Sequence, residues 1–390
     1  MQPVPLENDA FLTPVPGRWS AERANAWYDA LPWLVGCNYI PATAINAIEM
    51  WQASTYDAPT IGCELALARE TGTNTLRVYL HDLLHADDAE GLYGRMDEFL
   101  QACSDVGIRP MFVFFDDCHY GPPTLGDQPE PVHAWHNSGW LASPAKDVAV
   151  RYADGTSPAA EVDRLRRYVQ ETMRRFGDDE RVLLWELYNE PGRGEKTGTP
   201  GREATDVGEL GERSNRLLFD AWTWAREVAP SQPICSSALG SVGEGNIHIS
   251  RINSDVHSIH CYGPPKPTLR QIRDYQQDGR PILMTEWLAR SQGNTVRTIL
   301  PMLKRERVAA INWGIVIGKT QTHYAWFSRQ QLDDEGEHLT LHREREARHF
   351  LWPGEAIPEP PLWFHDLYRA DHTPCDADEI ACFRELTTSR

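Results

Sequence analysis

Short apolar runs alternate along the chain with segments of helical spacing, and this alternation constrains the fold more than any other feature. A short apolar run bounded by turn residues is typical of a buried strand. Eight such runs occur, at residues 33–39, 75–80, 110–115, 182–189, 233–238, 256–263, 281–287 and 308–316. Eight strands that alternate with helices predict an α/β fold of the (β/α)8 TIM barrel class. An open doubly wound sheet is disfavoured, because the glycine fingerprint that follows its first strand is missing.

The helical segments complete this prediction. We expect helices at about residues 59–71, 96–106, 157–173, 210–229, 268–278, 294–305, 341–351 and 376–386. A length of 390 residues allows two or three domains, but a barrel of this size can be one domain. We therefore predict one catalytic barrel over residues 31–352, with an irregular N-terminal lead-in (1–30) and a C-terminal extension (353–390) packed on it. Residues 117–157 are rich in Pro, Gly, Trp and His without periodicity, which indicates a long folded loop.

Composition limits the partners. The chain has 56 acidic and 38 basic residues, a net charge of −18 that argues against nucleic acid or an anionic membrane as a partner. No apolar run is long enough to span a bilayer, and Met1 to Ser20 lacks the apolar segment of a signal peptide, so the expected location is cytoplasmic. Five of the eight cysteines lie within or next to apolar strand or helix patterns, which indicates buried free thiols rather than disulfides. The absence of a CxxC pair argues against a zinc ribbon. The sequence does not indicate an oligomeric state.

The fourth strand ends in an unusual way. Its apolar run continues into Asn189-Glu190-Pro191-Gly192. Pro191 cannot donate to a sheet and Gly192 permits a sharp turn, so the strand should stop near Asn189. Glu190 is then a carboxylate at the carboxyl end of a buried strand, where the active sites of parallel α/β folds are found. A desolvated charge is costly unless it is paired, so this glutamate either binds a structural partner or has a function.

Other strand ends carry polar or aromatic residues, and in a barrel all of these ends converge at one face. They are Asn38-Tyr39, Arg77, Asp116-Asp117, Asn189-Glu190, His260, Tyr262, Glu286 and Trp313. Glu190 and Glu286, on strands four and seven, should face each other across the barrel mouth. Two carboxyl groups that flank a glycosidic bond are the machinery of sugar hydrolysis.

The neighbouring residues fit this chemistry. Arg77 can keep Glu286 ionised, although a purely structural ion pair inside the barrel is an alternative. Tyr262 can donate to the same carboxylate, and Asn189 is placed to bind a sugar 2-hydroxyl. Trp313 offers a flat face to a sugar or, alternatively, packs in the core. His260 is either a substrate ligand or a hydrogen-bonded interior residue.

Five strand ends together resemble clan A glycoside hydrolases, especially family 5, the cellulase-like enzymes. The motifs are Arg77, Asn189-Glu190-Pro191, His260-Cys261-Tyr262, Thr285-Glu286-Trp287 and Trp313. The resemblance covers about residues 34–318. It implies a retaining mechanism with Glu190 as the acid/base, Glu286 as the nucleophile and about 5–5.5 Å between their carboxyl groups. It also implies that no metal or organic cofactor takes part.

The third strand departs from this family pattern. Family 5 enzymes usually carry a histidine at its end, whereas this chain has Asp116-Asp117, with His119 slightly later. All three are candidate substrate ligands. Either aspartate could bind two adjacent sugar hydroxyls, and a salt bridge to a loop arginine is an equal alternative.

These observations favour a retaining β-glycoside hydrolase that acts on a β-linked glucan, mannan or xylan, or on an oligosaccharide derived from one. The long loop after the third strand slightly favours exo action. A metal-dependent barrel hydrolase is an alternative, but the His-x-His expected on strand one is absent from Gly36-Cys37-Asn38-Tyr39. A barrel that binds sugar without cleaving it is a third possibility, disfavoured by the presence of both carboxylates.

Overall fold

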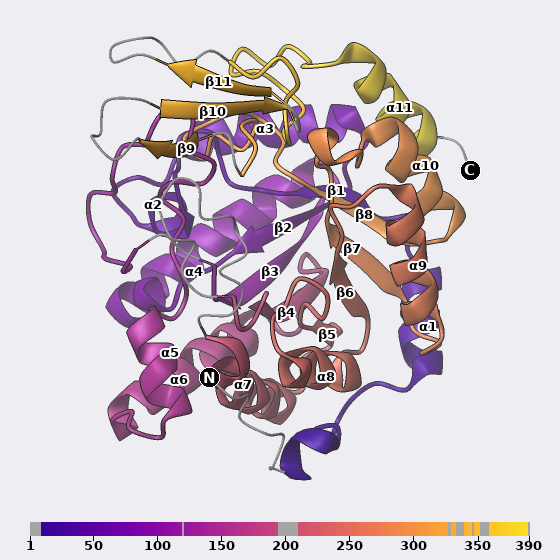
Figure 1. The fold of residues 1–390 in the computed structure, drawn as a ribbon. Coiled ribbons are helices and arrows are strands. Elements are labelled where there is room, and N and C mark those ends of the chain that lie inside the picture. Colours follow the sequence, from indigo (N-terminus) through magenta and orange to yellow (C-terminus); the bar gives the residue numbers. More distant parts are fainter. Residues whose placement is uncertain are drawn as a thin grey trace.

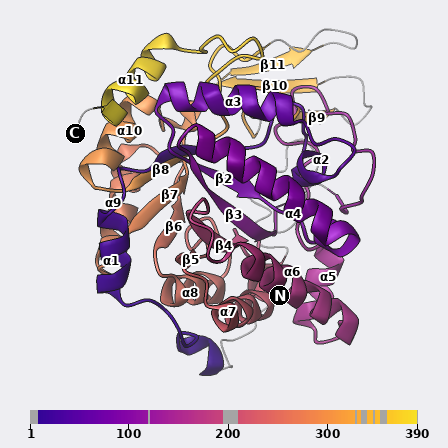
Figure 2. The ribbon, with the colours of Figure 1, turned by 180° about the vertical axis from the view of Figure 1, so that it is seen from behind.

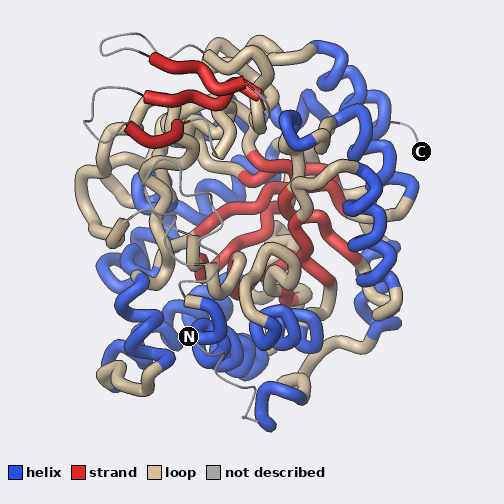
Figure 3. The backbone as a smooth tube through the Cα atoms, viewed as in Figure 1, coloured by secondary structure: helices blue, strands red, loops and turns tan. Residues whose placement is uncertain are grey.

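The computed structural model of the chain describes residues 9–118, 121–193, 210–326, 329–332, 339–344, 347–351 and 359–388. Eight parallel strands form one curved sheet at its centre, and helices surround this sheet (Figures 1 and 3). The strands are β1 (Val35–Asn38), β2 (Thr75–Tyr79), β3 (Arg109–Asp116), β4 (Leu184–Asn189), β5 (Ile234–Cys235), β6 (His257–His260), β7 (Ile282–Glu286) and β8 (Ala309–Trp313). Their order is β5-β4-β3-β2-β1-β8-β7-β6, and a parallel bridge between Ser237 and Ser258 joins the two ends. The predicted (β/α)8 barrel is confirmed.

Nearly every strand residue is buried, as expected for parallel strands covered on both faces. One apolar cluster fills the amino end of the barrel and includes Met111, Leu184, Leu283 and Ile311. The N-terminal lead-in contributes Trp19 to this cluster, and helix α1 (Ala21–Asp29) follows it. The lead-in therefore closes the barrel at the end opposite the candidate site.

Six of the surrounding helices overlap predicted ones, but the helix predicted at 96–106 begins earlier, at Asp82. The six are α3 (Ala58–Thr71), α4 (Asp82–Asp105), α6 (Ala159–Phe176), α7 (Asn215–Val228), α9 (Pro265–Gln276) and α10 (Val296–Arg305) (Figure 2). Four helices were not predicted: α1, in the lead-in that was expected to be irregular, α2 (Ala47–Trp51), α5 (Lys146–Ala153) and α8 (Glu244–Asn253). Helix α8 begins after Gly243 and contains Gly245, and glycine weakens a helical pattern. None of the helices in the described part of the chain is both long and apolar enough to cross a membrane.

One predicted helix, at residues 341–351, is wrong. This region forms two strands, β10 (Leu339–Glu344) and β11 (Ala347–Leu351), which pair antiparallel with each other. Together with β9 (Arg329–Leu332) they make a separate three-stranded sheet beside the barrel (Figure 1). The charged run within this segment suggested a helix, whereas the Leu-Thr-Leu alternation at its start has the period of a strand.

Two long segments return to the carboxyl end of the barrel. The chain after β3 comes back to pair Ser143 with Asp116, with N···O distances of 2.6 and 3.0 Å between their main chains. Arg290 binds the C-terminal segment. It donates hydrogen bonds to the main-chain oxygens of His365 (2.5 Å) and Asp366 (2.9 Å), and it forms an ion pair with Glu379 (2.6 Å). Glu379 lies on helix α11 (Ala377–Thr388), close to the predicted 376–386. Both segments can therefore contribute side chains to the barrel mouth.

A buried carboxyl on helix α3 makes stability depend on pH. Glu64 is 1% exposed and accepts hydrogen bonds from Tyr39 Oη (2.8 Å) and the Ala42 amide (3.0 Å). Burial raises the pKa of Glu64 to about 7, and the two hydrogen bonds only partly oppose this shift. The folded protein therefore holds the Glu64 proton more tightly than the unfolded chain does. The associated stabilisation is complete at low pH and is lost as pH rises towards 7.

We predict that Glu64→Gln, which cannot ionise, gains stability relative to the wild type as pH rises from 5 to 8. The free energy of unfolding of the variant minus that of the wild type should increase by roughly 2 to 3 kcal/mol between pH 5 and pH 8. Urea denaturation followed by circular dichroism at each pH measures it. A difference that stays constant with pH would contradict the prediction.

Candidate active site

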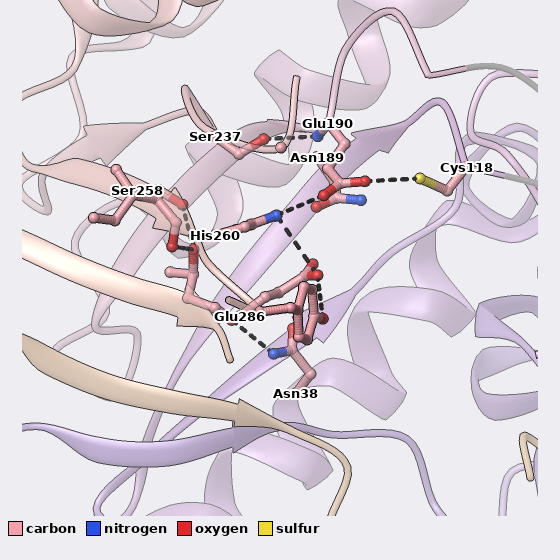
Figure 4. Close-up of polar contacts among 12 residues, drawn as sticks. Asn38, Cys118, Asn189, Glu190, Ser237, Ser258, His260 and Glu286 are labelled. Carbon is pink, nitrogen blue, oxygen red and sulfur yellow. Dashed lines mark hydrogen bonds and ion pairs between the residues drawn. The ribbon is translucent and has the colours of Figure 1, made fainter. Parts of the chain in front are cut away.

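Glu190 and Glu286 face each other at the carboxyl ends of β4 and β7 (Figure 4). An oxygen of each lies within 4.8 Å of the other. Glu190 has a left-handed backbone (φ 41°), which is rare for a residue with a side chain and common at functional sites. Its amide donates to Ser237 Oγ at 2.6 Å, which holds this turn against the segment that follows β5. The side chains of both glutamates are largely buried.

Glu286 is held by three donors. Its Oε1 accepts from Arg77 Nη1 (2.7 Å) and Tyr79 Oη (3.2 Å), and its Oε2 accepts from Tyr262 Oη (2.7 Å). Burial and the charge of Glu286 raise the pKa of Tyr262 well above its ordinary value, so the phenol stays protonated and donates. This carboxylate is thus fixed in orientation, with its negative charge complemented by donors.

Arg77 has no exposed surface, so it acts through its neighbours and not on a substrate directly. Its guanidinium makes a two-point ion pair with Glu186, with Nε–Oε2 and Nη2–Oε1 distances of 2.9 and 2.7 Å. Burial acts to lower the pKa of Arg77, but the charges of Glu186 and Glu286 outweigh it and raise this pKa above the ordinary value. Glu186 was not among the predicted residues. A carboxylate inside an otherwise apolar strand was the available signal, because such a group needs a cationic partner.

Glu190 has different surroundings. His260 Nδ1 lies 2.9 Å from Glu190 Oε1 and 3.5 Å from Glu286 Oε2, so the imidazole bridges the two carboxylates. On its other oxygen, Glu190 contacts Cys118 Sγ (3.3 Å) and Arg193 Nε (3.2 Å). The charge of Glu190 raises the pKa of Arg193. Neither Cys118 nor Arg193 was predicted, because both lie in loops beyond the strand ends.

Gly240 makes room for this arrangement. A Cβ atom at this position would lie 2.4 Å from Glu190 Oε1 and 2.7 Å from His260 Nδ1. The residue also has a φ of 100°, which favours glycine. A larger residue would therefore displace the carboxylate from its place beside His260.

The two aspartates after β3 have separate positions. Asp116 accepts from Asn189 Nδ2 (2.8 Å) and Trp140 Nε1 (2.7 Å), and burial raises its pKa to about 7 against these hydrogen bonds. Asp117 has no exposed surface and accepts from Tyr188 Oη, Ser214 Oγ and the Gly192 amide. The expected role of Asp117 as a sugar ligand therefore needs correction, since its carboxylate holds the loop after β4. His119 lies outside the described residues.

An aromatic wall lines one side of the site. The partly exposed Trp313 meets Tyr79 and Trp140, with ring centroids 6.2 and 5.7 Å apart and planes at 63°. Tyr262 packs edge-on against Trp326 at 4.9 Å. Trp140 and Trp326 come from the loops after β3 and β8, whose paths the strand pattern did not reveal.

The site is therefore that of a (β/α)8 barrel with two opposed carboxylates at the carboxyl ends of its strands. Neither a protein-family model nor a curated protein sequence matches the chain.

Solved structures do resemble this fold. An endo-β-1,4-mannanase from Thermotoga petrophila has a TM-score of 0.53 at 13% identity, over 91% of this chain and 76% of that chain. An exo-β-1,4-mannosidase from Opitutaceae bacterium strain TAV5 gives 0.52 at 16% identity, over 91% and 59%. A GH5_18 variant from Bifidobacterium longum, in complex with Manβ1-4GlcNAc, gives 0.51 at 11% identity, over 91% and 77%. At these identities the likeness establishes the shared barrel fold.

We predict that Glu186→Gln destabilises the protein by roughly 3–5 kcal/mol, because it leaves the buried Arg77 without its two-point partner. Urea denaturation of wild type and variant measures this loss. The matched control is Asp378→Asn, which removes the partner of Arg297 from an ion pair of similar length (2.7 Å) on the surface. Solvent screens that pair, so its loss should change the midpoint little. Equal effects of the two substitutions would contradict the proposed importance of the Arg77 pair.

Proposed function

We propose that this protein is a retaining β-glycoside hydrolase, with Glu286 as the nucleophile and Glu190 as the acid/base. One observation carries the proposal: the two carboxylates have oxygens within 4.8 Å of each other at the mouth of the barrel. Oxygens this close fit the carboxyl separation of about 5–5.5 Å in retaining enzymes better than the separation of about 6.5–9.5 Å that lets inverting enzymes admit a water molecule.

The different surroundings of the two glutamates support this division of roles. Glu286 is fixed by Arg77 and Tyr262, as a nucleophile that must meet the anomeric carbon requires. Glu190 lies at a turn and shares His260 with Glu286. In the proposed mechanism Glu190 carries the proton and Glu286 the negative charge in the resting enzyme.

The reaction follows from these positions. Glu286 attacks the anomeric carbon while Glu190 gives its proton to the departing glycosidic oxygen, which leaves a covalent glycosyl-enzyme. Glu286 is then an uncharged ester, and Glu190 has given up its proton. In this form Glu190 removes a proton from water, which releases the sugar with its original anomeric configuration.

We further propose a β-mannoside as the first substrate to test, with β-glucosides and β-xylosides as comparators. Several solved proteins with this fold are named as mannanases or mannosidases. Trp313 is partly exposed and offers a flat apolar face of the kind on which sugar rings stack, and the buried Trp140 packs beside it. The loop after β3 and the C-terminal segment both reach the barrel mouth, which favours exo action on short oligosaccharides.

Site-directed variants test the mechanism. We expect Glu286→Gln to reduce hydrolysis of every aryl β-glycoside to background. Glu190→Ala should lower the rate about 10²–10⁴-fold on substrates with poor leaving groups and far less on activated aryl glycosides. Added azide should restore turnover in Glu190→Ala, with a β-glycosyl azide as product. Activity that survives in Glu286→Gln would overturn the assignment.

The stereochemistry of the product gives an independent prediction. NMR spectra recorded during hydrolysis by the wild type should show the β-anomer first, with the α-anomer appearing only through mutarotation. Initial release of the α-anomer would overturn the retaining mechanism.

A metal-dependent hydrolase is the second candidate, because Glu190, His260 and Glu286 form a possible ligand set. The guanidinium groups of Arg77 and Arg193 beside the two carboxylates disfavour it, since cations repel a bound metal ion. We expect no stoichiometric metal in the purified protein and unchanged hydrolysis after treatment with EDTA. Loss of activity that zinc restores would favour the second candidate.

A further inference from the structure

The carboxylate of Asp116 lies behind the site at the end of β3 and is only 3% exposed. Its Oδ1 accepts from Asn189 Nδ2 (2.8 Å) and from the Cys118 amide (2.9 Å). Its Oδ2 accepts from Trp140 Nε1 (2.7 Å). One buried carboxylate thus joins three different segments of the chain at the barrel mouth.

The first of these contacts fixes an amide. Asn189 Oδ1 accepts from Arg77 Nη2 at 2.6 Å, while Asn189 Nδ2 donates to Asp116. A flipped amide would turn its NH₂ group towards the guanidinium and its oxygen towards the carboxylate, and both contacts would be repulsive. Asn189 therefore has one orientation, in which its second N–H points away from Asp116.

The other two contacts fix the walls of the site. The Trp140 ring packs edge-on against Tyr79 (5.0 Å, 88°) and beside Trp313 (5.7 Å). Cys118, whose amide is held by Asp116, places its thiol 3.3 Å from Glu190 Oε2 on the side away from His260 (Figure 4). Movement of Asp116 would therefore shift Trp140 in the aromatic wall and Cys118 beside Glu190.

We propose that Asp116 is a positioning residue, which orients the Asn189 amide towards the substrate 2-hydroxyl and fixes Trp140 beside Trp313. This inference rests on the proposed glycosidase function. It also replaces the expectation that Asp116 binds sugar hydroxyls itself, because both of its oxygens accept from protein donors.

The chemistry requires a carboxylate here and not its amide. Three N–H groups point at Asp116, and an ionised carboxylate has acceptor sites for all of them. An asparagine would direct an NH₂ group at Trp140 or Asn189. The parallel register of β3 and β4 places Asp116 opposite Asn189, so strand pairing brings these two residues together.

Asp116→Asn tests the proposal with two substrates: the 4-nitrophenyl β-glycoside that the wild type hydrolyses fastest, and its 2-deoxy counterpart. We expect kcat/KM to fall about 100-fold on the 4-nitrophenyl glycoside, because one transition-state contact is lost. On the 2-deoxy substrate, which lacks the 2-hydroxyl, kcat/KM should fall less than about 5-fold. Asn189→Ala should show the same pattern. The loss that depends on the 2-hydroxyl should be no greater in the double variant than in Asn189→Ala, because both changes remove that same interaction.

Asp255→Asn is the matched control. Asp255 is also a buried carboxylate that accepts from backbone amides, of Trp19 and Ile234, but at the other end of the barrel. Its loss should lower stability and affect both substrates equally. Equal losses on both substrates in Asp116→Asn would likewise indicate a merely structural role and overturn the proposal.

An NMR measurement separates failure of this inference from failure of the proposed function. The indole N–H resonance of Trp140, identified by its absence in Trp140→Phe, should shift in Asp116→Asn because its acceptor is lost. An unmoved resonance would overturn the role of Asp116 whatever the substrate. A wild type that hydrolyses no glycoside, even though the resonance shifts, would overturn the proposed function and with it the role at the 2-hydroxyl.

Discussion

The buried guanidinium of Arg77 is the interaction on which the site depends. A charge without exposed surface is stable in a protein only when opposite charges and hydrogen bonds surround it. Arg77 on β2 meets Asn38 on β1, Glu186 on β4 and Glu286 on β7, all within 2.9 Å. These contacts connect four of the eight strands through a single side chain. The barrel end and the candidate nucleophile are therefore stabilised by the same group.

The second carboxylate in this cluster bears on the proposed role of Glu286 as the nucleophile. If Arg77 paired with Glu286 alone, the pair would carry no net charge. The arginine would then reduce the reactivity of the carboxylate towards the anomeric carbon of the sugar. Because Glu186 takes two of the guanidinium hydrogen bonds, the charge of Arg77 is shared between two carboxylates. The cluster keeps a net negative charge, and Tyr262 orients its reactive end. The ion pair can thus position Glu286 without neutralising it.

The sequence predicted this site in so far as it depends on strand ends. Parallel strands bring their carboxyl ends together, so Arg77, Glu190, Tyr262 and Glu286 could be placed from the alternation of strands and helices alone. Other residues of the site lie in loops, whose sequences have neither the helical nor the strand period. Trp140 and Trp326 come from long loops, and their contacts depend on tertiary packing that a single chain pattern does not contain.

The same distinction explains the errors. Asp116 and Asp117 were expected to bind sugar hydroxyls, whereas their partners in the structure are a neighbouring asparagine, a loop tryptophan and loop hydroxyl or amide groups. Whether a polar residue at a strand end faces the substrate or the protein depends on which segments cover it. The segment at 341–351 was misread because charged residues occur in helices as well as in strands.

The residues on strands and the residues in loops also differ in their proposed functions. The groups assigned to bond cleavage lie on or directly after strands, whereas much of the wall that would meet the sugar lies on added segments. Arg290, in the loop after the β7 strand that carries Glu286, holds the C-terminal segment through His365, Asp366 and Glu379. His365 in turn packs against Tyr262, with centroids 5.4 Å apart. The C-terminal segment is therefore part of the site, since it supports the tyrosine that orients Glu286.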